Sequence, residues 1–438
     1  MTKKSLPLVT VTLDKVVGGG QTLGTLEDGR KLFVWGGLPG ETVEAQLTKK
    51  KASYAEGIVT NVLVPSNQRV APQDPGSYLS TSPWQIMTFD AEQHYKAALI
   101  EEAFELHDIV LPDPIDIYTD DREYHYRNKV EFSWYSTTDE TGTDTLDLAF
   151  FRRGSKGKIP IDQCSLLPEP MMQLAREIRE HLGSAGITAR QLKTLLIRQD
   201  QVGNCVWQLY VKDEDFDTAI PGLDDRGQGG EIIYSNPKSP ASVITKRLAE
   251  FGHIVLSDQV LGVPFRYATE GFFQINLPVY EQALKDMRRW VNDEDGKQQG
   301  KVVDLYSGVG SIGLTIGGDD VTLVEVNEHA VREMQRNITE LEMRATPVLA
   351  ASENALDHIT SDKIIIVDPP RAGLHEAVIS RLLETAPRRI IYLSCNPVTQ
   401  ARDVAKLAEL YGIRAHRGYN FFPRTPHIEH LVVLDKKA

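Results

Sequence analysis

Cysteine is scarce in this sequence, which has only Cys164, Cys205 and Cys395 among its 438 residues. The three lie far apart and none belongs to a Cys-x-x-Cys pair. This spacing excludes a disulfide scaffold, and it excludes a four-cysteine zinc or iron–sulfur site built from this chain alone. Few, scattered cysteines are typical of a reducing compartment, so we expect a cytoplasmic protein.

Long apolar runs are also missing. No segment approaches the roughly 20 apolar residues that a membrane-spanning helix needs, so we expect no membrane partner. Residues 1–13 lack the apolar region and cleavage site of a signal peptide. The formal net charge of −13 disfavours indiscriminate binding to nucleic acid but allows a local basic face. The length predicts two or three domains.

The N-terminal segment, residues 1–65, is predicted to be a small β-barrel. From residue 8 onward it contains short β-rich runs separated by glycine turns. Lys49, Lys50 and Lys51 lie close to Tyr54, and such a cluster suits an RNA backbone with a stacked base. For the three lysines alone, a solvated hairpin tip is the simpler interpretation.

Residues 66–270 read as a connector followed by a mixed α/β domain. A helix is expected over roughly 89–106, and the strands after it form the most basic and aromatic part of the chain. We interpret these strands as an RNA-facing surface, with an ordinary sheet edge protected by positive charge as an equal alternative. Cys164 and Cys205 fall in this region and are expected to be buried structural residues. The residues of the surface are Tyr124, Tyr126, Arg127, Lys129, Arg152, Arg153, Lys156 and Lys158.

Residues 271–438 form the last predicted domain. From about residue 278 apolar runs alternate with amphipathic helical segments, which predicts a doubly wound, largely parallel sheet. Asp304 ends one apolar run and is followed by Gly308, Gly310 and Gly313, which let a ligand approach the backbone. Glu325 ends the next run, where an acid can hold a ribose diol. No lysine follows the glycines, so the loop suits S-adenosylmethionine better than a triphosphate. The alternative is a tight turn with an exposed glutamate.

Cys395 lies where another apolar run, residues 389–393, meets Pro397 and must turn. Open α/β sheets place their chemistry at this end of their strands, and a cysteine thiolate is a strong nucleophile. The alternative is a buried cysteine that acts as a small apolar residue.

Two carboxylates accompany the cysteine in this half of the chain. Asp368 precedes two prolines and Arg371, a rigid turn without the aromatic ring expected of an enzyme that methylates an amino nitrogen. Glu429 directly precedes the apolar run Leu431–Leu434. Alone it would be a surface residue, whereas beside a nucleophilic cysteine it could act as a general base.

Five motifs occur in order and together carry a resemblance: Phe-Gln-Ile-Asn at 273–276, Asp-Leu-Tyr-Ser-Gly-Val-Gly at 304–310, Asp-Pro-Pro-Arg-Ala-Gly at 368–373, Ser-Cys-Asn-Pro at 394–397, and Phe-Pro-Arg-Thr-Pro-His-Ile-Glu at 422–429. The chain resembles the RNA 5-methyluridine methyltransferases over nearly its whole length. The implied fold is α/β: a C-terminal Rossmann-like class I methyltransferase domain, a mixed α/β central RNA-binding domain and an N-terminal OB-like TRAM barrel. The implied cofactor is S-adenosyl-L-methionine.

The resemblance also implies roles for single residues. Cys395 matches the nucleophile and Glu429 matches the base that removes the C5 proton. Ser311 stands where members usually carry asparagine. The other cofactor-contacting positions match Gln274, Tyr306, Glu325, Asp368 and Asn354, with Glu353 as an equally local candidate beside Asn354.

The largest departure from the family lies upstream. Its rRNA-modifying members often bind an iron–sulfur cluster through cysteines between the barrel and the central domain, and residues 78–87 contain none. We therefore expect no iron–sulfur cluster and no metal, with the aromatic and apolar side chains of this stretch in its place. The tRNA-modifying members typically lack the barrel as well as the cluster. A chain with a barrel but no cluster therefore matches neither group fully, and the substrate stays open between rRNA and tRNA.

The predicted activity is formation of 5-methyluridine in rRNA or tRNA by a monomeric RNA-modifying enzyme. One alternative is a cytosine-C5 RNA methyltransferase, although its RNA-acting members use two cysteines near the site and only Cys395 is available. The other is a non-catalytic RNA-binding or folding factor, which intact Cys395, Asp368 and Glu429 argue against.

Overall fold

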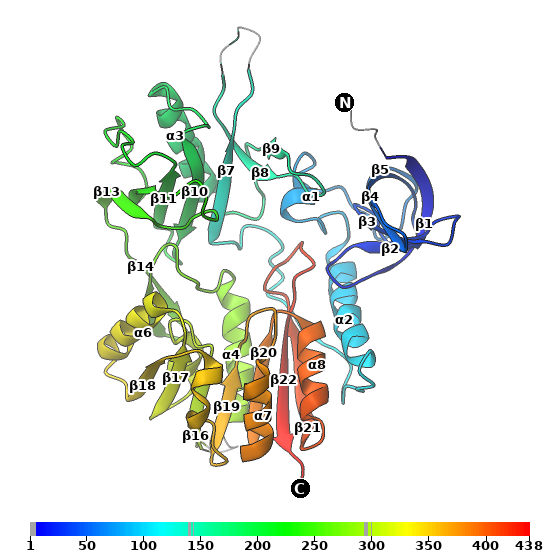
Figure 1. Cartoon of the computed structure of the whole chain (residues 1–438), viewed down its shortest axis with the longest axis vertical. Coiled ribbons are helices and arrows are strands. Elements are labelled where there is room, and N and C mark those ends of the chain that lie inside the picture. The colour runs from blue at the N-terminus through cyan, green and yellow to red at the C-terminus, as the bar shows by residue number, and fades with distance from the viewer. Residues whose placement is uncertain (1–5, 139–141, 143, 293–296, 299) are drawn as a thin grey trace.

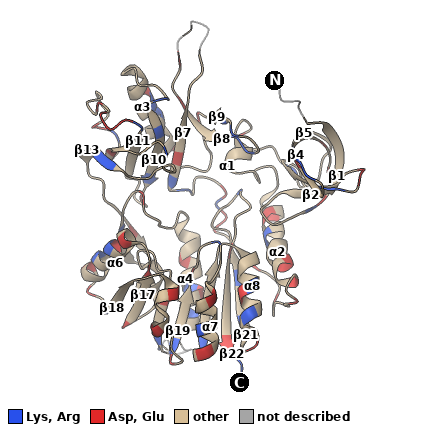
Figure 2. Cartoon of the chain, viewed as in Figure 1, with Lys and Arg blue, Asp and Glu red and all other residues tan. Residues whose placement is uncertain are grey.

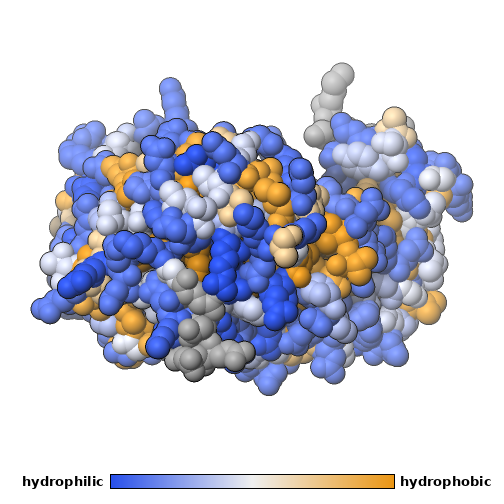
Figure 3. All heavy atoms as spheres, turned by 90° about the horizontal axis from the view of Figure 1, so that it is seen from below, coloured by the Kyte–Doolittle hydropathy of each residue, from blue (hydrophilic) through white to orange (hydrophobic). Residues whose placement is uncertain are grey.

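The computed structural model describes the whole chain except residues 1–5, 139–141, 143, 293–296 and 299. Three bodies follow one another along the chain (Figure 1): a barrel, a central α/β sheet, and a larger C-terminal sheet with helices on both faces. Among the described residues, no helix is long and apolar enough to cross a membrane. The face shown in Figure 3 is mostly hydrophilic, with scattered apolar patches.

The barrel is closed, with the strand order β1-β2-β3-β5-β4. Buried side chains alternate with exposed ones along its strands, and Leu13, Leu32, Val34 and Val43 fill the interior. This period of two comes from the pleat of each strand. The strands are β1 (Leu8–Val16), β2 (Thr22–Thr25), β3 (Lys31–Trp35), β4 (Thr42–Lys50) and β5 (Tyr54–Val64).

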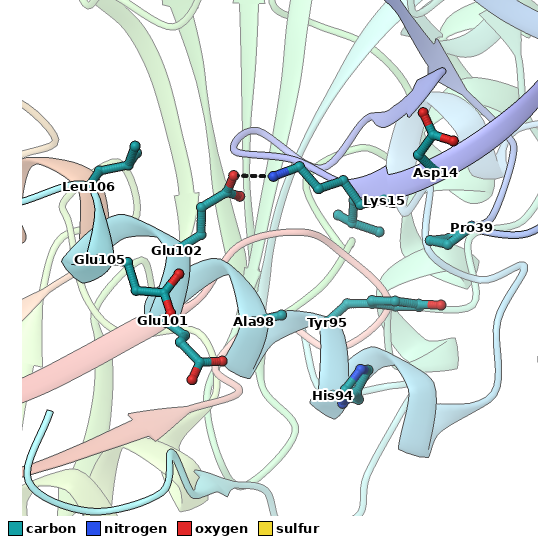
Figure 4. A pocket seen from close by; sticks show the side chains of 11 residues that line it. Asp14, Lys15, Pro39, His94, Tyr95, Ala98, Glu101, Glu102, Glu105 and Leu106 are labelled. Carbon is teal, nitrogen blue, oxygen red and sulfur yellow. Dashed lines mark hydrogen bonds and ion pairs between the residues drawn. The ribbon is translucent and has the colours of Figure 1, made fainter. Parts of the chain in front are cut away.

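A cavity of about 490 Å³ lies between the barrel and helix α2 (Phe89–Glu105). Figure 4 shows Lys15 of β1 reaching across it to Glu102 of α2, an ion pair of 2.5 Å. Acidic side chains dominate the helix side of the cavity, as the red segments of α2 in Figure 2 also show. None of the predicted site residues lines this cavity.

The central sheet has seven strands in the order β13-β12-β11-β10-β7-β8-β9. Helix α3 (Glu169–Ser184) packs on it through its apolar stripe. Cys164 and Cys205 are buried here, which confirms the prediction for both. The short helix α1 (Tyr78–Thr81) precedes the sheet. The strands are β7 (Lys129–Tyr135), β8 (Asp147–Phe151), β9 (Lys158–Pro160), β10 (Leu192–Gln199), β11 (Cys205–Val211), β12 (Gly229–Tyr234) and β13 (Lys246–Gly252).

The C-terminal sheet has eight strands in the order β18-β17-β16-β19-β20-β22-β21-β6. Strands β16 to β20 are parallel, and β22 lies antiparallel between β20 and β21. The strand order reverses between β16 and β19, the place where such sheets bind ligands. The strands are β16 (Lys301–Leu305), β17 (Val321–Glu325), β18 (Ala345–Leu349), β19 (Lys363–Val367), β20 (Arg389–Ser394), β21 (Tyr411–Tyr419) and β22 (Glu429–Lys436).

Helices cover both faces of this sheet. One face packs against α4 (Leu277–Val291), α5 (Ser311–Ile316) and α6 (Glu328–Glu340), and the other against α2, α7 (Glu376–Thr385) and α8 (Pro397–Leu407). Two short 3-10 helices, η1 (Ser352–Asn354) and η2 (Leu356–His358), follow β18. The doubly wound α/β architecture predicted from the alternating pattern is thus confirmed.

Segments from before residue 270 also belong to this C-terminal body. Strand β6 (Ile117–Tyr118) pairs with β21. Helix α2 packs on the same sheet face as α8, and the hairpin β14 (Leu256–Val260) and β15 (Val263–Tyr267) shares a core with α4. The domain boundaries stay a prediction, because the chain crosses into the last body before its predicted start.

Candidate active site

Cys395 lies between the end of β20 and the start of α8, partly exposed to solvent. Asn396 caps the helix, since its side-chain Oδ1 accepts a hydrogen bond from the Val398 N–H at 3.2 Å. Pro397 occupies the first helical position, where no backbone donor is needed. The sulfur therefore sits at a helix N-terminus, whose partial positive charge favours a thiolate.

Glu429 lies opposite Cys395 on the neighbouring strand of the C-terminal sheet. Strands β20 and β22 are antiparallel with Ser394 opposite His430, so the next position in register brings Cys395 opposite Glu429. On its other side, Glu429 pairs with Tyr419 of β21. The side chain is buried, with 6% of its surface exposed, at the very start of its strand. The structure thus brings together two residues that are 34 positions apart in the sequence.

Asp368 follows β19, the other neighbour of β20, and its loop is fastened to the cysteine loop. The side-chain amide of Asn396 and the hydroxyl of Thr399 both donate to the carbonyl oxygen of Arg371, at 2.9 and 3.1 Å. Asp403, which is fully buried in α8, accepts a hydrogen bond from the Leu374 N–H at 2.8 Å. These contacts hold the two motifs in a fixed relation.

Gly373 shows how closely the loop after β19 approaches helix α8. Its φ of +81° lies in the left-handed region, and a Cβ here would come within 2.5 Å of the Asp403 carboxylate. Only glycine meets both demands without strain. Asn396, Thr399 and Asp403 were not among the predicted site residues, although Asp403 belongs to the triplet Ala-Arg-Asp at 401–403, shortly after the Ser-Cys-Asn-Pro motif.

Burial and like charges dominate the electrostatics of the site. Burial raises the pKa of Asp368 to about 7. Burial, and then the Asp368 charge, raise the pKa of Glu429 well above its usual value, against the opposing guanidinium of Arg371. Burial, followed by the charges of Glu429 and Asp368, raises the pKa of the Cys395 thiol to about 11, again opposed by Arg371. The Cys395 side chain of the free protein is therefore a protonated thiol at neutral pH, with two carboxylates nearby that can hold a proton.

The glycine loop joins β16 to α5 in the manner the sequence predicts. Tyr306, Gly308 and Gly310 all have positive φ values, of 65°, 58° and 86°. The Glu325 carboxylate, at the end of β17, accepts hydrogen bonds from the N–H groups of Gly308 and Asn327, at 2.9 and 2.7 Å. Its position next to this loop is the one expected for a ribose-binding acid.

The surroundings of the Asp304 carboxylate indicate whether the glycine loop after β16 fits S-adenosylmethionine. The side chain is buried and one oxygen accepts a hydrogen bond from the Gly313 N–H at 2.9 Å. The other oxygen, Oδ1, is buried without a hydrogen-bond partner among the described residues, and burial raises the pKa of this carboxyl to about 8. An unused acceptor beside the left-handed Gly308, where no atom lies within 4 Å of a Cβ position, fits a ligand that carries an ammonium group and a ribose.

The remaining predicted cofactor residues lie around this loop to different extents. Ser311 starts α5, and its hydroxyl lies 2.8 Å from the hydroxyl of Tyr280. Tyr306 is half-buried, and burial raises its pKa. Asn354 is exposed on η1, beyond the end of β18. Gln274 is buried in the segment before α4, and its side chain forms no hydrogen bond within the described part of the chain.

Arg198 holds the Gln274 segment from the central sheet. Its guanidinium donates to the carbonyl oxygens of Gly271 and Phe273, at 2.7 and 2.9 Å, and stacks on Tyr267 with 4.4 Å to the ring centre. Asn128 adds a hydrogen bond of 3.3 Å to the Gln274 carbonyl oxygen. The central sheet thus positions a segment of the cofactor side.

A buried charge network holds the loop that leads into Glu429. Glu92 of α2 accepts hydrogen bonds from the Arg424 N–H and the Asn420 side chain, at 2.9 and 2.8 Å, and pairs with Lys96 at 2.9 Å. Lys96 in turn donates to Asn420 Oδ1 and to the Phe422 carbonyl oxygen. Arg424, with φ of +63°, also forms an ion pair with Glu123. No sequence motif indicated this network, because the side chains of α2 and the loop that they hold lie more than 300 residues apart.

The predicted RNA-facing surface is corrected in part. Tyr126 is 3% exposed and its hydroxyl donates to the Pro423 carbonyl oxygen, so it cannot stack on a base. Lys129 is turned inward onto the carbonyl oxygen of Glu270 at 2.9 Å. Both residues therefore hold segments next to the site, Tyr126 the loop before Glu429 and Lys129 the segment before Gln274. Phe151, by contrast, is 61% exposed and has the Lys158 ammonium 5.5 Å from its ring centre.

The stretch 78–87 forms structural contacts. Trp84, Ile86 and Met87 are buried in a core that also contains Val16 of the barrel. Asp74 and Gln85 hydrogen-bond each other, and Asp74 also accepts from Ser165 of the central domain. In the described part of the chain, no group of three or more His, Cys, Asp or Glu side chains could hold a metal ion.

Comparison with known proteins gives three family matches. Residues 8–60 match the TRAM domain, residues 290–391 the methyltransferase small domain, and residues 352–437 the tRNA (uracil-5-)-methyltransferase family. Each match coincides with part of one of the bodies described above.

Relatives and solved structures agree with these matches. An uncharacterized RNA methyltransferase of Nitratidesulfovibrio vulgaris is 27% identical, over 98% of this chain and 96% of its own. One from Enterococcus faecalis is 28% identical over 92% of each. The crystal structure of the Pyrococcus abyssi tRNA (uracil-54, C5)-methyltransferase with S-adenosyl-L-homocysteine shares the fold, with a TM-score of 0.77, 20% identity, and coverage of 97% of this chain and 100% of that chain.

The family matches and the fold together define a methyltransferase with a doubly wound sheet and an appended RNA-binding barrel. The chain is an S-adenosylmethionine-dependent RNA methyltransferase that carries a tRNA (uracil-5-)-methyltransferase family domain at residues 352–437 and a TRAM domain at residues 8–60. Its substrate is RNA.

Proposed function

We propose that this chain forms 5-methyluridine in RNA, with Cys395 as the nucleophile and Glu429 as the base. The observation that carries the proposal is the antiparallel pairing of β20 and β22, which sets Cys395 opposite Glu429. Asp368 on the neighbouring loop and the glycine loop of β16 complete the site.

The cysteine is needed because C5 of uracil is too weak a nucleophile to be methylated directly. Addition of the Cys395 thiolate to C6 moves an electron pair onto C5 and the O4 carbonyl, which gives an enolate. When bound, S-adenosylmethionine supplies the electrophilic methyl group that C5 takes up. Glu429 then removes the C5 proton, the C6–sulfur bond breaks, and the cysteine thiolate is regenerated.

The environment of each group suits these steps. The raised pKa of Glu429 makes its carboxylate a stronger base than an exposed glutamate. The partly exposed Cys395 thiol must lose its proton to solvent before it adds to C6, because Glu429 has to be a carboxylate for its later step. The start of α8 and Arg371 stabilise the resulting thiolate. The target base must also leave its stack to reach Cys395, so we expect base flipping.

The cofactor-contacting roles of Gln274, Tyr306, Ser311, Glu325, Asn354 and Asp368 belong to the same proposal. Asp368, Tyr306, Ser311 and Glu325 lie at the ends of β16, β17 and β19, where the sheet reverses its strand order. Asn354 lies one strand further out, on η1. We expect a monomer in the cytoplasm.

Product analysis tests the reaction. Purified protein and methyl-labelled S-adenosylmethionine are incubated separately with unmodified tRNA and large-subunit rRNA transcripts, and the labelled nucleoside is identified after digestion. Label in 5-methyluridine from one transcript supports the proposal and identifies the substrate. Label in 5-methylcytidine would contradict it, as would no label on either transcript or on assembled ribosomal subunits.

A further inference from the structure

Three side chains next to the proposed catalytic residues form a hydrogen-bonded row on the sheet face beneath α2 and α8. His430 follows Glu429 on β22, His416 lies on β21, and Gln400 lies on α8. His430 Nδ1 lies 2.7 Å from Gln400 Oε1, and His430 Nε2 lies 3.3 Å from His416 Nδ1. His416 Nε2 lies 2.9 Å from the Asp113 carbonyl oxygen.

The orientation of the Gln400 amide is fixed by its surroundings. Its Nε2 lies 3.0 Å from the Tyr392 carbonyl oxygen and 2.9 Å from the His430 carbonyl oxygen. Both are acceptors, so the amide nitrogen must face them and use both of its hydrogens. The Gln400 oxygen therefore faces His430, and His430 Nδ1 must carry a proton.

The protons on the two imidazole rings can now be counted. The Asp113 carbonyl oxygen is also only an acceptor, so His416 Nε2 must carry a proton. The remaining contact, between His430 Nε2 and His416 Nδ1, needs one proton between two nitrogens. Two neutral imidazoles hold two protons, whereas this row requires three. Without the third, two bare lone pairs would face each other in a buried place.

We propose that His416 and His430 share one extra proton, so that the pair carries a single positive charge, and that this pair and Gln400 position the start of β22 against α8. Gln400 links the two elements, because it contacts β20, β22 and His430 from α8. The relevance to catalysis rests on the proposed function, since α8 begins just after Cys395 and β22 begins at Glu429.

The surroundings of the pair offer little other charge. Phe104 of α2 places its ring edge-on to His430, with 5.3 Å between ring centres. Among the described residues, the charge of Asp113 and the rings themselves are the ionisable groups that shift the two histidines. Burial lowers the pKa of both histidines, that of His430 well below its usual value, and at His416 the hydrogen bond to the Asp113 carbonyl oxygen and the Asp113 charge act against it. The shared proton is bound at low pH and is lost as the pH rises through the apparent pKa of the pair.

Nitrogen-15 NMR of the histidine rings in the full-length protein tests the proton count. On the low-pH side, we expect His430 to be protonated at both nitrogens and His416 at Nε2 with Nδ1 as an acceptor. One coupled transition should move both residues together within the pH range over which the protein stays folded. Two neutral rings throughout this range, or two independent transitions, would overturn the proposal.

Two variants test the positioning role. H416F removes the acceptor for His430 Nε2, whereas H416N keeps an amide oxygen there and should preserve the charged His430. We expect kcat to fall about tenfold in H416F below the transition, the loss of one good hydrogen bond, and to stay close to wild type in H416N. H94F, at an exposed histidine of α2, is the matched control.

The pH profile separates positioning from a structural role. Dividing the wild-type rate by the H416F rate at each pH removes the contribution of the Cys395 thiol, and the ratio should fall toward one through the NMR transition. A ratio that is constant with pH would overturn the positioning role. A wild-type protein that methylates no RNA would instead contradict the proposed function, while the NMR measurement would still test the shared proton.

Discussion

At the scale of single residues, the proposed nucleophile Cys395 is hard to ionise, and only a few neighbouring groups favour its thiolate form. Burial and two carboxylates raise the pKa of Cys395, while Arg371 and the start of α8 favour the thiolate. A protonated resting thiol protects the cysteine from oxidation and alkylation when no RNA is bound. Reactivity then depends on what the bound substrate does to this balance.

The raised thiol pKa predicts slow, strongly pH-dependent alkylation of the free protein. Below a pKa of about 11, the thiolate fraction of Cys395 grows tenfold for each pH unit. The rate of iodoacetamide labelling, followed by peptide mapping, should therefore rise about tenfold from pH 7 to 8 and again from pH 8 to 9. In R371Q the rate should drop, because the opposing positive charge is gone. A rate that levels off near pH 8 in the folded protein would contradict the raised pKa.

At the scale of elements, the site depends on two loops that are locked by α8. Asp403 holds the loop after β19, and Asn396 holds both that loop and its own helix. From the other side, Glu92 and Lys96 of α2 hold the loop before β22. The proposed catalytic residues therefore lie on loops that are held in place by hydrogen bonds to helices α8 and α2.

Substitution of Gly373 tests this lock. G373A places a Cβ within 2.5 Å of the Asp403 carboxylate at a φ of +81°. We expect the free energy of unfolding to fall by about 1–3 kcal/mol, with a lower kcat, as measured by urea titration and single-turnover methylation. The matched control is G412A on β21, where a Cβ meets no atom within 4 Å and the φ is ordinary. Equal effects of the two substitutions would refute the lock.

Local sequence patterns predicted many elements but not their long-range pairing. The helix expected at 89–106 and the strand that ends at Glu325 stand out by their apolar pattern, and the strand before Cys395 stands out because its apolar run stops at Pro397. The hairpin 256–267 was missed because its polar residues obscure the alternation. The burial of Tyr126 and the approach of Glu92 to Arg424 were also missed, since each depends on a contact hundreds of residues away.

At the scale of the whole molecule, the barrel and the central sheet meet through the β8–β9 hairpin. The Arg153 guanidinium lies 4.2 Å from the ring centre of Trp35, and its backbone N–H donates to Ser80. Phe151, Arg152 and Lys156 of the same hairpin are exposed. In Figure 2 the ribbon near β8 and β4 carries the blue of lysine and arginine, whereas that of α2 carries the red of acidic residues. An acidic protein with this local basic face should bind RNA selectively rather than by overall charge.

Substitutions in the hairpin test this RNA surface. F151A should weaken RNA binding by about 1–3 kcal/mol, the value of one stacked base. R152Q combined with K156Q should lower the slope of log affinity against log salt, because two phosphate contacts are lost. V202A, at an exposed residue of the β10–β11 turn, is the control and should bind like wild type. Fluorescence anisotropy across a salt series measures both effects, and an unchanged affinity and slope would place the RNA elsewhere.

The most direct test of the central claim, that Cys395 and Glu429 act as nucleophile and base, is the fate of E429Q. The variant keeps the side-chain shape but cannot remove the C5 proton, so methyl transfer should occur and elimination should stall. Incubation with RNA and S-adenosylmethionine, followed by denaturing mass spectrometry, should then show a methylated protein–RNA adduct attached through Cys395 and absent from E429Q/C395A. Normal turnover of E429Q without an adduct would contradict the account.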